Sequence, residues 1–339
     1  MRKMALCWDA AAARAVSIMA EAGGAVSAAM RFAANARVRT AIPFIGAIVL
    51  AGAAICQGPE VRFSSDVNVV TLLATVRGRD GNIVKNLSKD DFRLEENGRR
   101  QTIRYFAAES DLPLKVCLLV DTSRSMQSVF EAERKATGRF LEQMLRQDKD
   151  VAAVVHFDVR VGMLQDFTSS REQLADAMAR LRIPGRPATL LYDAIKQTAE
   201  DQMRPKMGRK AFILLSDGLD VRSQTSLPTA IEYAQRADTL IYSVLFAHYG
   251  MRRRNGKRQQ NGRKVMERLA RETGGGFFEV TPENPIDRIY SQIEDELRNQ
   301  YSIGFTPEKL DKDGKYRKLK LTTLRKGLAV RTRDGYYPK

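Results

Sequence analysis

The sequence predicts an α/β fold with a doubly wound, mostly parallel sheet, placed between a small N-terminal antiparallel β-domain and a C-terminal β tail. Three observations predict it. Between residues 114 and 299, short apolar runs alternate with stretches of helical periodicity, which is typical of a parallel sheet covered by helices. One of these runs, residues 116–120, ends in Asp-x-Ser-x-Ser at 121–125. Outside this region, β-branched segments are separated by Asp-Gly and Asn-Gly turns, which favour antiparallel hairpins.

The composition is that of a globular protein and narrows the classes of partner. Of the 339 residues, 44% are hydrophobic and 28% are charged, which is enough for a large core and for two or three domains. The formal charge of +16 raises the question of anionic partners, but the sequence has no zinc-finger spacing and no basic helix with heptads. We therefore expect no nucleic-acid partner. The three cysteines make no disulfide framework, and we expect Cys117 to be buried in a strand.

Residues 1–56 are predicted to be an export signal with an N-terminal extension. Residues 41–56 are almost wholly apolar and follow a basic stretch, an arrangement that is typical of a secretory signal peptide. The run is short for a membrane span of about 20 residues. We expect export to a periplasmic, extracellular or envelope-attached location; an uncleaved anchor helix and lipidation of Cys56 are the alternatives. The long region before the apolar run favours translation from Met30.

Three folded regions are predicted after the signal. Residues 60–108 have the pattern of a small β-sandwich-like domain, with strands at 67–76, 90–96 and 101–106. Residues 113–306 would form the α/β domain. Residues 307–339 are strand-like again at 316–322 and 328–332. These last strands have two open placements, at the edge of the parallel sheet or in the N-terminal β-domain, and we favour the second.

The α/β region is predicted element by element from its periodicity. The strands after 116–120 are expected at 151–157, 161–164, 211–216, 239–246 and 277–280. The helices are expected at 130–145, 171–181, 190–203, 227–237, 264–273 and 284–299.

Oxygen-bearing side chains follow the predicted strands at three places. Asp121, Ser123 and Ser125 follow the first strand, Thr189 opens a helix, and Asp217 follows a later strand. The carboxyl ends of parallel strands meet at one edge of a sheet. Two carboxylates and three hydroxyls suit a hard cation, Mg²⁺ or Mn²⁺, and leave a position for water or an outside ligand. The first segment alone suits a capped turn equally well, so the prediction depends on all three.

This set resembles the metal-ion-dependent adhesion site of the von Willebrand factor type A domain, which has an Asp-x-Ser-x-Ser segment, a Thr on a second loop and an Asp on a third. The resemblance covers residues 113–306, and flanks such as 90–98 and 334–338 resemble the related secreted proteins of acidobacteria. It implies that a carboxylate of a protein partner fills the open metal position. The chain would then be an exported adhesion module and not an enzyme. One departure is the second loop, which reads Gly-Arg-Pro-Ala-Thr at 185–189 where Gly-Gly-Thr is usual.

Other residues are expected beside these five. Asp193 and Asp220 would hold the metal ligands in place without touching the cation. The alternative is that Asp193 is an ordinary carboxylate in the first turn of a helix and Asp220 an ordinary carboxylate in a turn. The rim that contacts a partner would comprise Met126, Gln127, Arg186 and Leu219. Unremarkable loop surface is the alternative for these four.

The loop 251–264 carries the one dense basic patch of the sequence, including Arg252, Arg253, Arg254, Lys257 and Arg258. Binding of an anionic surface or polysaccharide through this loop is the alternative function. A Mg²⁺-dependent hydrolase is less favoured, because the only two histidines, His156 and His248, lie in no catalytic spacing. His156 is expected in the core or on the sheet.

Overall fold

A computed structural model describes residues 69–109, 112–184, 188–246, 256–308 and 313–338, without the side chains of Glu109 and residues 256–259. The predicted signal region with Met30 and Cys56, the rim residue Arg186, and the basic residues at 252–254 lie outside the described residues. Residues 67–339 form one compact unit. Within the described part of the chain, no helix has both the length and the apolar character needed to cross a bilayer.

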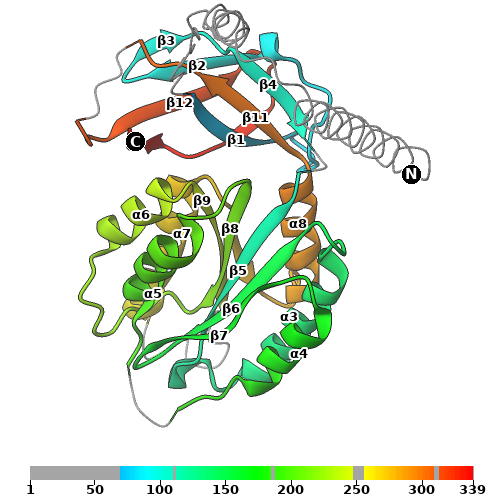
Figure 1. Cartoon of the computed structure of the whole chain (residues 1–339), viewed down its shortest axis with the longest axis vertical. Coiled ribbons are helices and arrows are strands. Elements are labelled where there is room, and N and C mark those ends of the chain that lie inside the picture. The colour runs from blue at the N-terminus through cyan, green and yellow to red at the C-terminus, as the bar shows by residue number, and fades with distance from the viewer. Residues whose placement is uncertain (1–68, 110–111, 185–187, 247–255, 309–312, 339) are drawn as a thin grey trace, which may run out of the picture. The chain divides into compact units, whose positions relative to one another are not determined.

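A six-stranded sheet forms the centre of the α/β region, in the order β10-β9-β8-β5-β6-β7 (Figure 1). Its strands are β5 (Leu114–Asp121), β6 (Val151–Phe157), β7 (Val161–Thr168), β8 (Arg209–Ser216), β9 (Thr239–Phe246) and β10 (Phe277–Val280). All neighbouring pairs are parallel except β6 and β7. The predicted doubly wound, mostly parallel sheet is confirmed.

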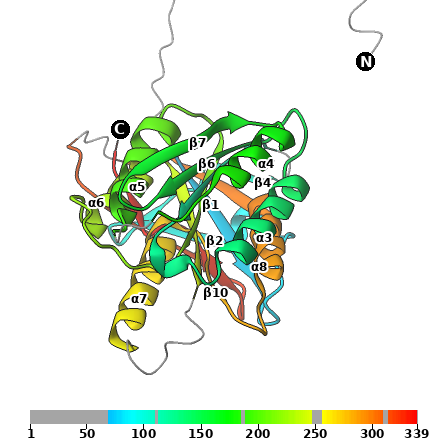
Figure 2. The same cartoon turned by 90° about the horizontal axis from the view of Figure 1, so that it is seen from below.

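Helices cover both faces of this sheet (Figures 1 and 2). One face carries α3 (Phe130–Met144), α4 (Arg171–Arg180) and α8 (Ile286–Arg298), and the other carries α5 (Leu191–Thr198), α6 (Leu227–Arg236) and α7 (Gly256–Thr273). Successive residues of β5 point to opposite faces, so Val116 and Leu118 join the first core whereas Cys117 and Leu119 join the second. Cys117 is a free, fully buried thiol, as the sequence predicts.

Helix α7 differs from the prediction at its start. The sequence predicts a basic loop at 251–264 and a helix only from residue 264, but the helix begins at Gly256. The Lys, Arg and Gln residues after Gly256 are good helix formers, and this propensity outweighs the charge run that suggested a loop. Lys257 and Arg258 therefore lie on a helix.

Close backbone packing at the start of β10 gives a stability prediction. A side chain at Gly275 would collide with the backbone of Ile241 in β9, whereas one at Gly138 in α3 would meet open space. We expect Gly275→Ala to lower the free energy of unfolding by about 2 kcal/mol, because overpacking forces the backbone apart. Gly138→Ala should raise it by about 0.5–1 kcal/mol, because alanine favours a helix. Urea denaturation of both variants tests this pair; equal effects would contradict the packing.

A β-sandwich is built from both ends of the described chain. One sheet has the order β13-β1-β11-β4 and the other has the order β14-β12-β2-β3. Its strands are β1 (Val70–Arg77), β2 (Phe92–Glu96), β3 (Arg99–Gln101), β4 (Tyr105–Glu109), β11 (Gln300–Phe305), β12 (Arg317–Thr323), β13 (Ala329–Arg331) and β14 (Gly335–Tyr336). C-terminal β12 pairs with β2, and β13 pairs with β1, so the tail completes the N-terminal β-domain.

Two details of the sandwich differ from the prediction. Strand β11, which the predicted boundary at 306 assigns to the α/β domain, pairs with β1 and β4 of the sandwich. The predicted strand at 101–106 is two separate strands, because β3 pairs with β2 and β4 pairs with β11. Glu296 lies in the last turn of α8, shortly before β11, and its buried carboxylate accepts hydrogen bonds from Arg77 and Arg331 of the sandwich.

Candidate metal site

The first of the three predicted segments lies where β5 ends. Asp121 is the last residue of the strand, one position later than predicted, because it still pairs with Phe157 of β6. Its side chain is fully buried, and Oδ1 accepts a hydrogen bond of 2.9 Å from the backbone N–H of Ser123. Ser123 precedes a short 3₁₀ helix (Arg124–Met126), and its Oγ lies 2.9 Å from Oγ of Ser125. The turn therefore gathers the carboxylate and both hydroxyls.

The third segment is tied directly to the first. Strand β8 ends at Ser216, whose hydroxyl donates a 2.6 Å hydrogen bond to Oδ2 of Asp121. The next residue, Asp217, is 5% exposed, and its Oδ1 accepts a 3.0 Å hydrogen bond from the backbone N–H of Leu219. Gly218 donates its N–H to Ser216 Oγ at 3.0 Å. These contacts place Asp121 and Asp217 at the carboxyl ends of neighbouring strands.

The second segment is held against the third. Thr189 is buried and forms a two-bond bridge with Val221, in which Thr189 N–H donates to Val221 O at 3.2 Å and Val221 N–H donates to Thr189 O at 2.8 Å. Helix α5 starts two residues after Thr189, so the threonine precedes the helix rather than opening it. All three predicted segments thus meet at one edge of the sheet.

The electrostatics of this edge favour a cation. Burial, together with the negative charge of Asp217, raises the pKa of Asp121 to about 7. Two buried carboxylates side by side are costly without a positive charge. Across the described residues, no three His, Cys, Asp or Glu side chains converge as a metal cluster, so a cation here would need the hydroxyls as well. A donor set of carboxylates and hydroxyls fits Mg²⁺ or Mn²⁺ better than a soft metal.

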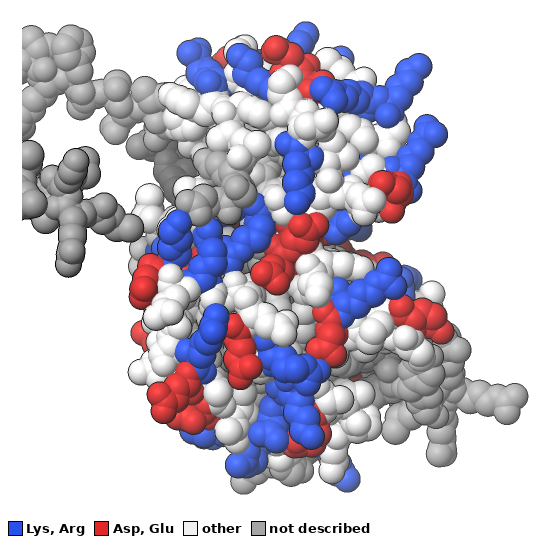
Figure 3. Space-filling model, turned by 90° about the vertical axis from the view of Figure 1, so that its right-hand side faces the viewer, with Lys and Arg blue, Asp and Glu red and all other residues white. Residues whose placement is uncertain are grey.

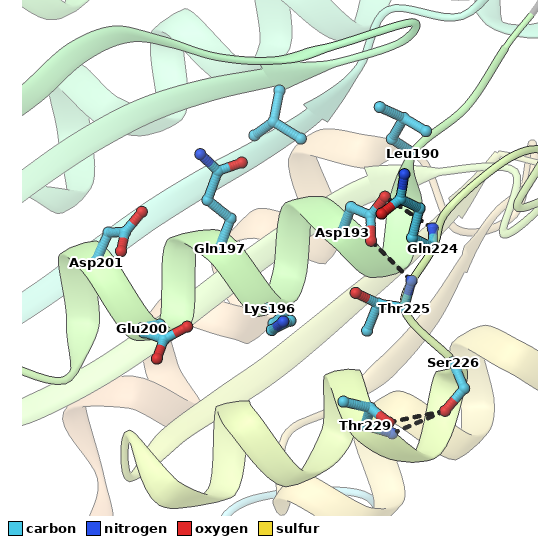
Figure 4. Close-up of a pocket in the computed structure, with 11 residues that line it drawn as sticks. Leu190, Asp193, Lys196, Gln197, Glu200, Asp201, Gln224, Thr225, Ser226 and Thr229 are labelled. Carbon is cyan, nitrogen blue, oxygen red and sulfur yellow. Dashed lines mark hydrogen bonds between the residues drawn. The ribbon is translucent and has the colours of Figure 1, made fainter.

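Asp193 and Asp220 clamp the loop after β8 to the start of α5. Asp193 accepts hydrogen bonds from the backbone N–H groups of Gln224 at 3.0 Å and Thr225 at 2.9 Å (Figure 4). Asp220 accepts from Tyr192 N–H at 3.3 Å and from Ser223 Oγ at 2.5 Å. Both carboxylates therefore fix the loop that carries Val221, the partner of Thr189.

Figure 4 also shows a polar pocket beside this clamp, between α5 and the start of α6. It has a volume of about 780 Å³ and is lined by residues that include Asp193, Lys196, Glu200 and Thr225. None of the five predicted ligands lines it. The pocket is a neighbour of the candidate site and not the site itself.

The predicted partner rim needs one correction. Met126 is fully buried in the core beneath the 3₁₀ turn, so it cannot contact a partner. A methionine directly after a polar loop looks like surface in the sequence, but the turn points it inward. Gln127 is exposed and Leu219 is half-buried, which leaves these two available for a rim.

Asp158, a buried carboxylate directly after β6, is a further residue of this region that is not among the predicted site residues. Its Oδ2 accepts a 2.8 Å hydrogen bond from Thr122 Oγ1, and its carbonyl accepts one of 3.1 Å from Leu190 N–H. Asp158 therefore joins the first segment to the second. His156 Nδ1 lies 3.4 Å from the same carboxylate. The argument about strand ends that found Asp217 applies equally to Asp158, which follows the strand 151–157.

Helix α7 contacts the third segment through two glycines. A side chain on Gly218 would collide with the backbone of Gly262, and one on Gly262 would collide with that of Asp217. The positive φ of 76° at Gly218 also requires glycine. The N-terminal half of α7, with its basic residues, is thereby held beside the Asp217 loop.

Comparison with known proteins gives a family match. The model of the von Willebrand factor type A domain matches residues 115–292. No curated protein matches the chain.

Several solved structures are similar to the chain at low identity. Proximal thread matrix protein 1 of the mussel byssus has a TM-score of 0.47 and 13% identity over 60% of this chain and 50% of that one; a further structure of it is described with zinc in its MIDAS motif. The vWF domain of the pilus tip protein Mfa5 from Porphyromonas gingivalis has a TM-score of 0.43 and 15% identity over 56% and 95%. The pilus adhesin SpaC from Lactobacillus rhamnosus GG, in its open conformation, has a TM-score of 0.44 and 10% identity over 72% of this chain and 47% of that one. The chain thus spans about half the length of the mussel protein.

Proposed function

Because this chain belongs to the von Willebrand factor type A domain family, we propose that it is an exported protein-binding module whose metal site ligates a carboxylate of its partner. The residues that would hold Mg²⁺, or Mn²⁺ in its place, are Asp121, Ser123, Ser125, Thr189 and Asp217. When bound, the cation would offer one open coordination position to an Asp or Glu side chain. The surrounding loops would supply shape selectivity.

The observation that carries this proposal is the buried pair of carboxylates at the edge of the sheet. Asp121 and Asp217 lie on adjacent strand ends, and Ser216 and the N–H of Ser123 orient both oxygens of Asp121. Such burial is unfavourable in a purely structural role and favourable once a divalent cation compensates it. The chain's own groups thus hold the carboxylate in place before a cation arrives.

A binding role accounts for these contacts better than catalysis does. His156 is the one histidine among the described residues, and its Nδ1 lies 3.4 Å from Asp158 Oδ2 and 3.4 Å from Thr122 Oγ1, within the contacts that join the loops. We assign this histidine to loop positioning. The proposed function accordingly has no chemical step.

The charge distribution supports an acidic protein partner more than an anionic surface. Figure 3 shows Lys and Arg side chains interspersed with Asp and Glu over one face of the molecule. Arg263 of α7 pairs with Glu267 and Glu279. Lys257 and Arg258 also belong to α7, and Gly262 of this helix packs on the Asp217 loop. Basic residues beside the site would favour a carboxylate ligand.

The proposal is tested with an array of short Glu-containing peptides, each matched by a Glu→Gln control, probed with the full chain in Mg²⁺. We expect binding to a subset of the Glu peptides that is lost on their Gln counterparts, in EDTA and in Asp121→Ala. Peptide binding that persists in EDTA but falls steeply with salt would contradict the proposal and favour the anionic alternative.

A further inference from the structure

Glu133 is a buried acid that no part of the proposed site uses. It lies on α3, it is 1% exposed, and neither carboxylate oxygen has a hydrogen-bond partner within the described part of the chain. Burial, and then the charge of Asp121, raises the pKa of Glu133 well above its usual value. An uncompensated carboxylate is among the most costly groups to bury, so this residue needs an explanation.

The surroundings of Glu133 give it no structural partner. The nearby basic residue on its own helix, Arg134, donates to Glu131 at 2.8 Å. On α8, burial raises the pKa of Tyr290 and the charge of Glu133 raises it further, but the Tyr290 hydroxyl is engaged 2.6 Å from Thr137 Oγ1. The other charged group that acts on Glu133 is Asp121, which repels it. Glu133 therefore lies near a second acid, and its carboxylate has no hydrogen-bond partner to compensate its burial.

A helix cap or a packing role does not account for Glu133 either. It is the fourth residue of α3, and in the first turn an acid usually faces solvent, where it complements the helix dipole without loss of hydration. Glu131 does this on the exposed side of the same turn. A buried position of this size would be filled more favourably by Leu, Met or Gln.

We propose that Glu133 is a third acidic group of the metal site, an outer carboxylate that does not touch the cation but stabilises it by charge and accepts hydrogen bonds from its water ligands. This inference rests on the proposed function, because it needs a cation at Asp121. Glu133 cannot be a direct ligand alongside Asp121 and Asp217, since the described residues hold no converging set of three acids. Its role is that of a positioning residue.

This role predicts opposite effects on the metal-free and metal-bound protein. Without a cation, a negative charge on Glu133 has only the acid Asp121 beside it and no compensating group, so this residue destabilises the folded protein. With a cation, the same charge strengthens binding. A residue with a purely structural role would affect stability alone and leave the metal affinity unchanged.

The test is the isosteric variant Glu133→Gln, compared with Glu142→Gln, which alters an exposed acid of the same helix. Mg²⁺ is titrated into the full chain by calorimetry. We expect Glu133→Gln to lower the affinity by about tenfold, the usual effect of losing one outer partner of a metal ligand. Electron paramagnetic resonance with Mn²⁺ should show unchanged ligation, and thermal unfolding in EDTA should occur at a higher temperature than in the wild type. Glu142→Gln should match the wild type in all three.

The outcomes separate this inference from the proposed function. If the wild type binds Mg²⁺ and Glu133→Gln binds it equally well, the outer-carboxylate role is overturned and the metal site stands. If Mn²⁺ loses a protein ligand in Glu133→Gln, Glu133 is a direct ligand and the inference is also overturned. If the wild type binds neither cation, both proposals fail.

Discussion

Replacing Asp150 with Asn will lower the free energy of unfolding by about 3 kcal/mol, the lower end of the range for breaking a buried ion pair. The carboxylate is fully buried, and it accepts hydrogen bonds from Leu114 N–H at 2.9 Å, Arg146 Nε at 3.0 Å and Arg298 Nη2 at 2.6 Å. It therefore joins the start of β5 to the ends of α3 and α8. Asparagine keeps the size but leaves two guanidinium groups without their counter-charge. We take the lower end because Arg146 is 29% exposed.

Urea denaturation at neutral pH measures this effect. Asp148→Asn is the matched control, because Asp148 is exposed in the same turn and has a positive φ of 64°, which asparagine tolerates. We expect the control to stay within about 0.5 kcal/mol of the wild type. Similar losses for the two variants would show that the turn, and not the buried ion pair, accounts for the stability.

The stabilisation that Asp150 provides should decrease as the pH falls. Burial alone would raise the pKa of Asp150, but hydrogen bonds from Arg146 and Arg298 outweigh it and hold the pKa well below its usual value. A carboxyl with a lowered folded-state pKa stabilises the protein above its unfolded-state pKa of about 3.9. That contribution is lost as the pH falls toward the folded-state pKa. The difference between wild type and Asp150→Asn should therefore shrink below about pH 4.

Replacing Asp121 with Ala will abolish the stabilisation of the protein by Mg²⁺. In the wild type, a cation that binds only the folded state should raise the free energy of unfolding by about 2.7 kcal/mol at a hundred times its dissociation constant. Asp121 accepts hydrogen bonds from Ser123 of its own segment and from Ser216 of the third segment, so its removal would take away a proposed ligand and the contact that aligns these two segments. Scanning calorimetry in Mg²⁺ and in EDTA measures the difference.

Asp201→Ala is the control for general electrostatic effects, because Asp201 is an exposed acid that lines the polar pocket beside α5. We expect this variant to keep the full Mg²⁺-dependent shift. A shift that persists in Asp121→Ala would mean that the cation stabilises the protein from another place.

The sheet and its two helical layers follow from patterns that one sequence can carry. Parallel strands are buried on both faces, so they appear in the sequence as apolar runs such as 116–120 and 211–216. Asp121 and Asp217 follow these runs directly and therefore lie at the same edge of the sheet. The sequence favours a place for the C-terminal strands in the N-terminal β-domain, where β12 and β13 pair with β2 and β1. It does not predict that β11 belongs there, because a strand that follows a helix directly looks like one more βα repeat.

The residues that the sequence did not reveal depend on helix phase and on contacts between distant segments. Glu133 stands in Phe-Glu-Ala-Glu-Arg-Lys, which reads as a solvated helix face, and only packing of α3 on the sheet buries it. Ser216 looks like the polar end of an apolar strand until its hydroxyl is seen to donate to Asp121. Met126 reads as loop surface, yet the 3₁₀ turn buries it. In each case the missing information was the direction of a side chain.

Isothermal titration of Mg²⁺ into EDTA-treated, dialysed wild-type protein and Asp121→Ala tests the central claim most directly. We predict saturable binding of one cation to the wild type and no measurable binding to the variant, with Mn²⁺ behaving in the same way. Equal binding to the two proteins, or none to either, would contradict a metal site built on Asp121.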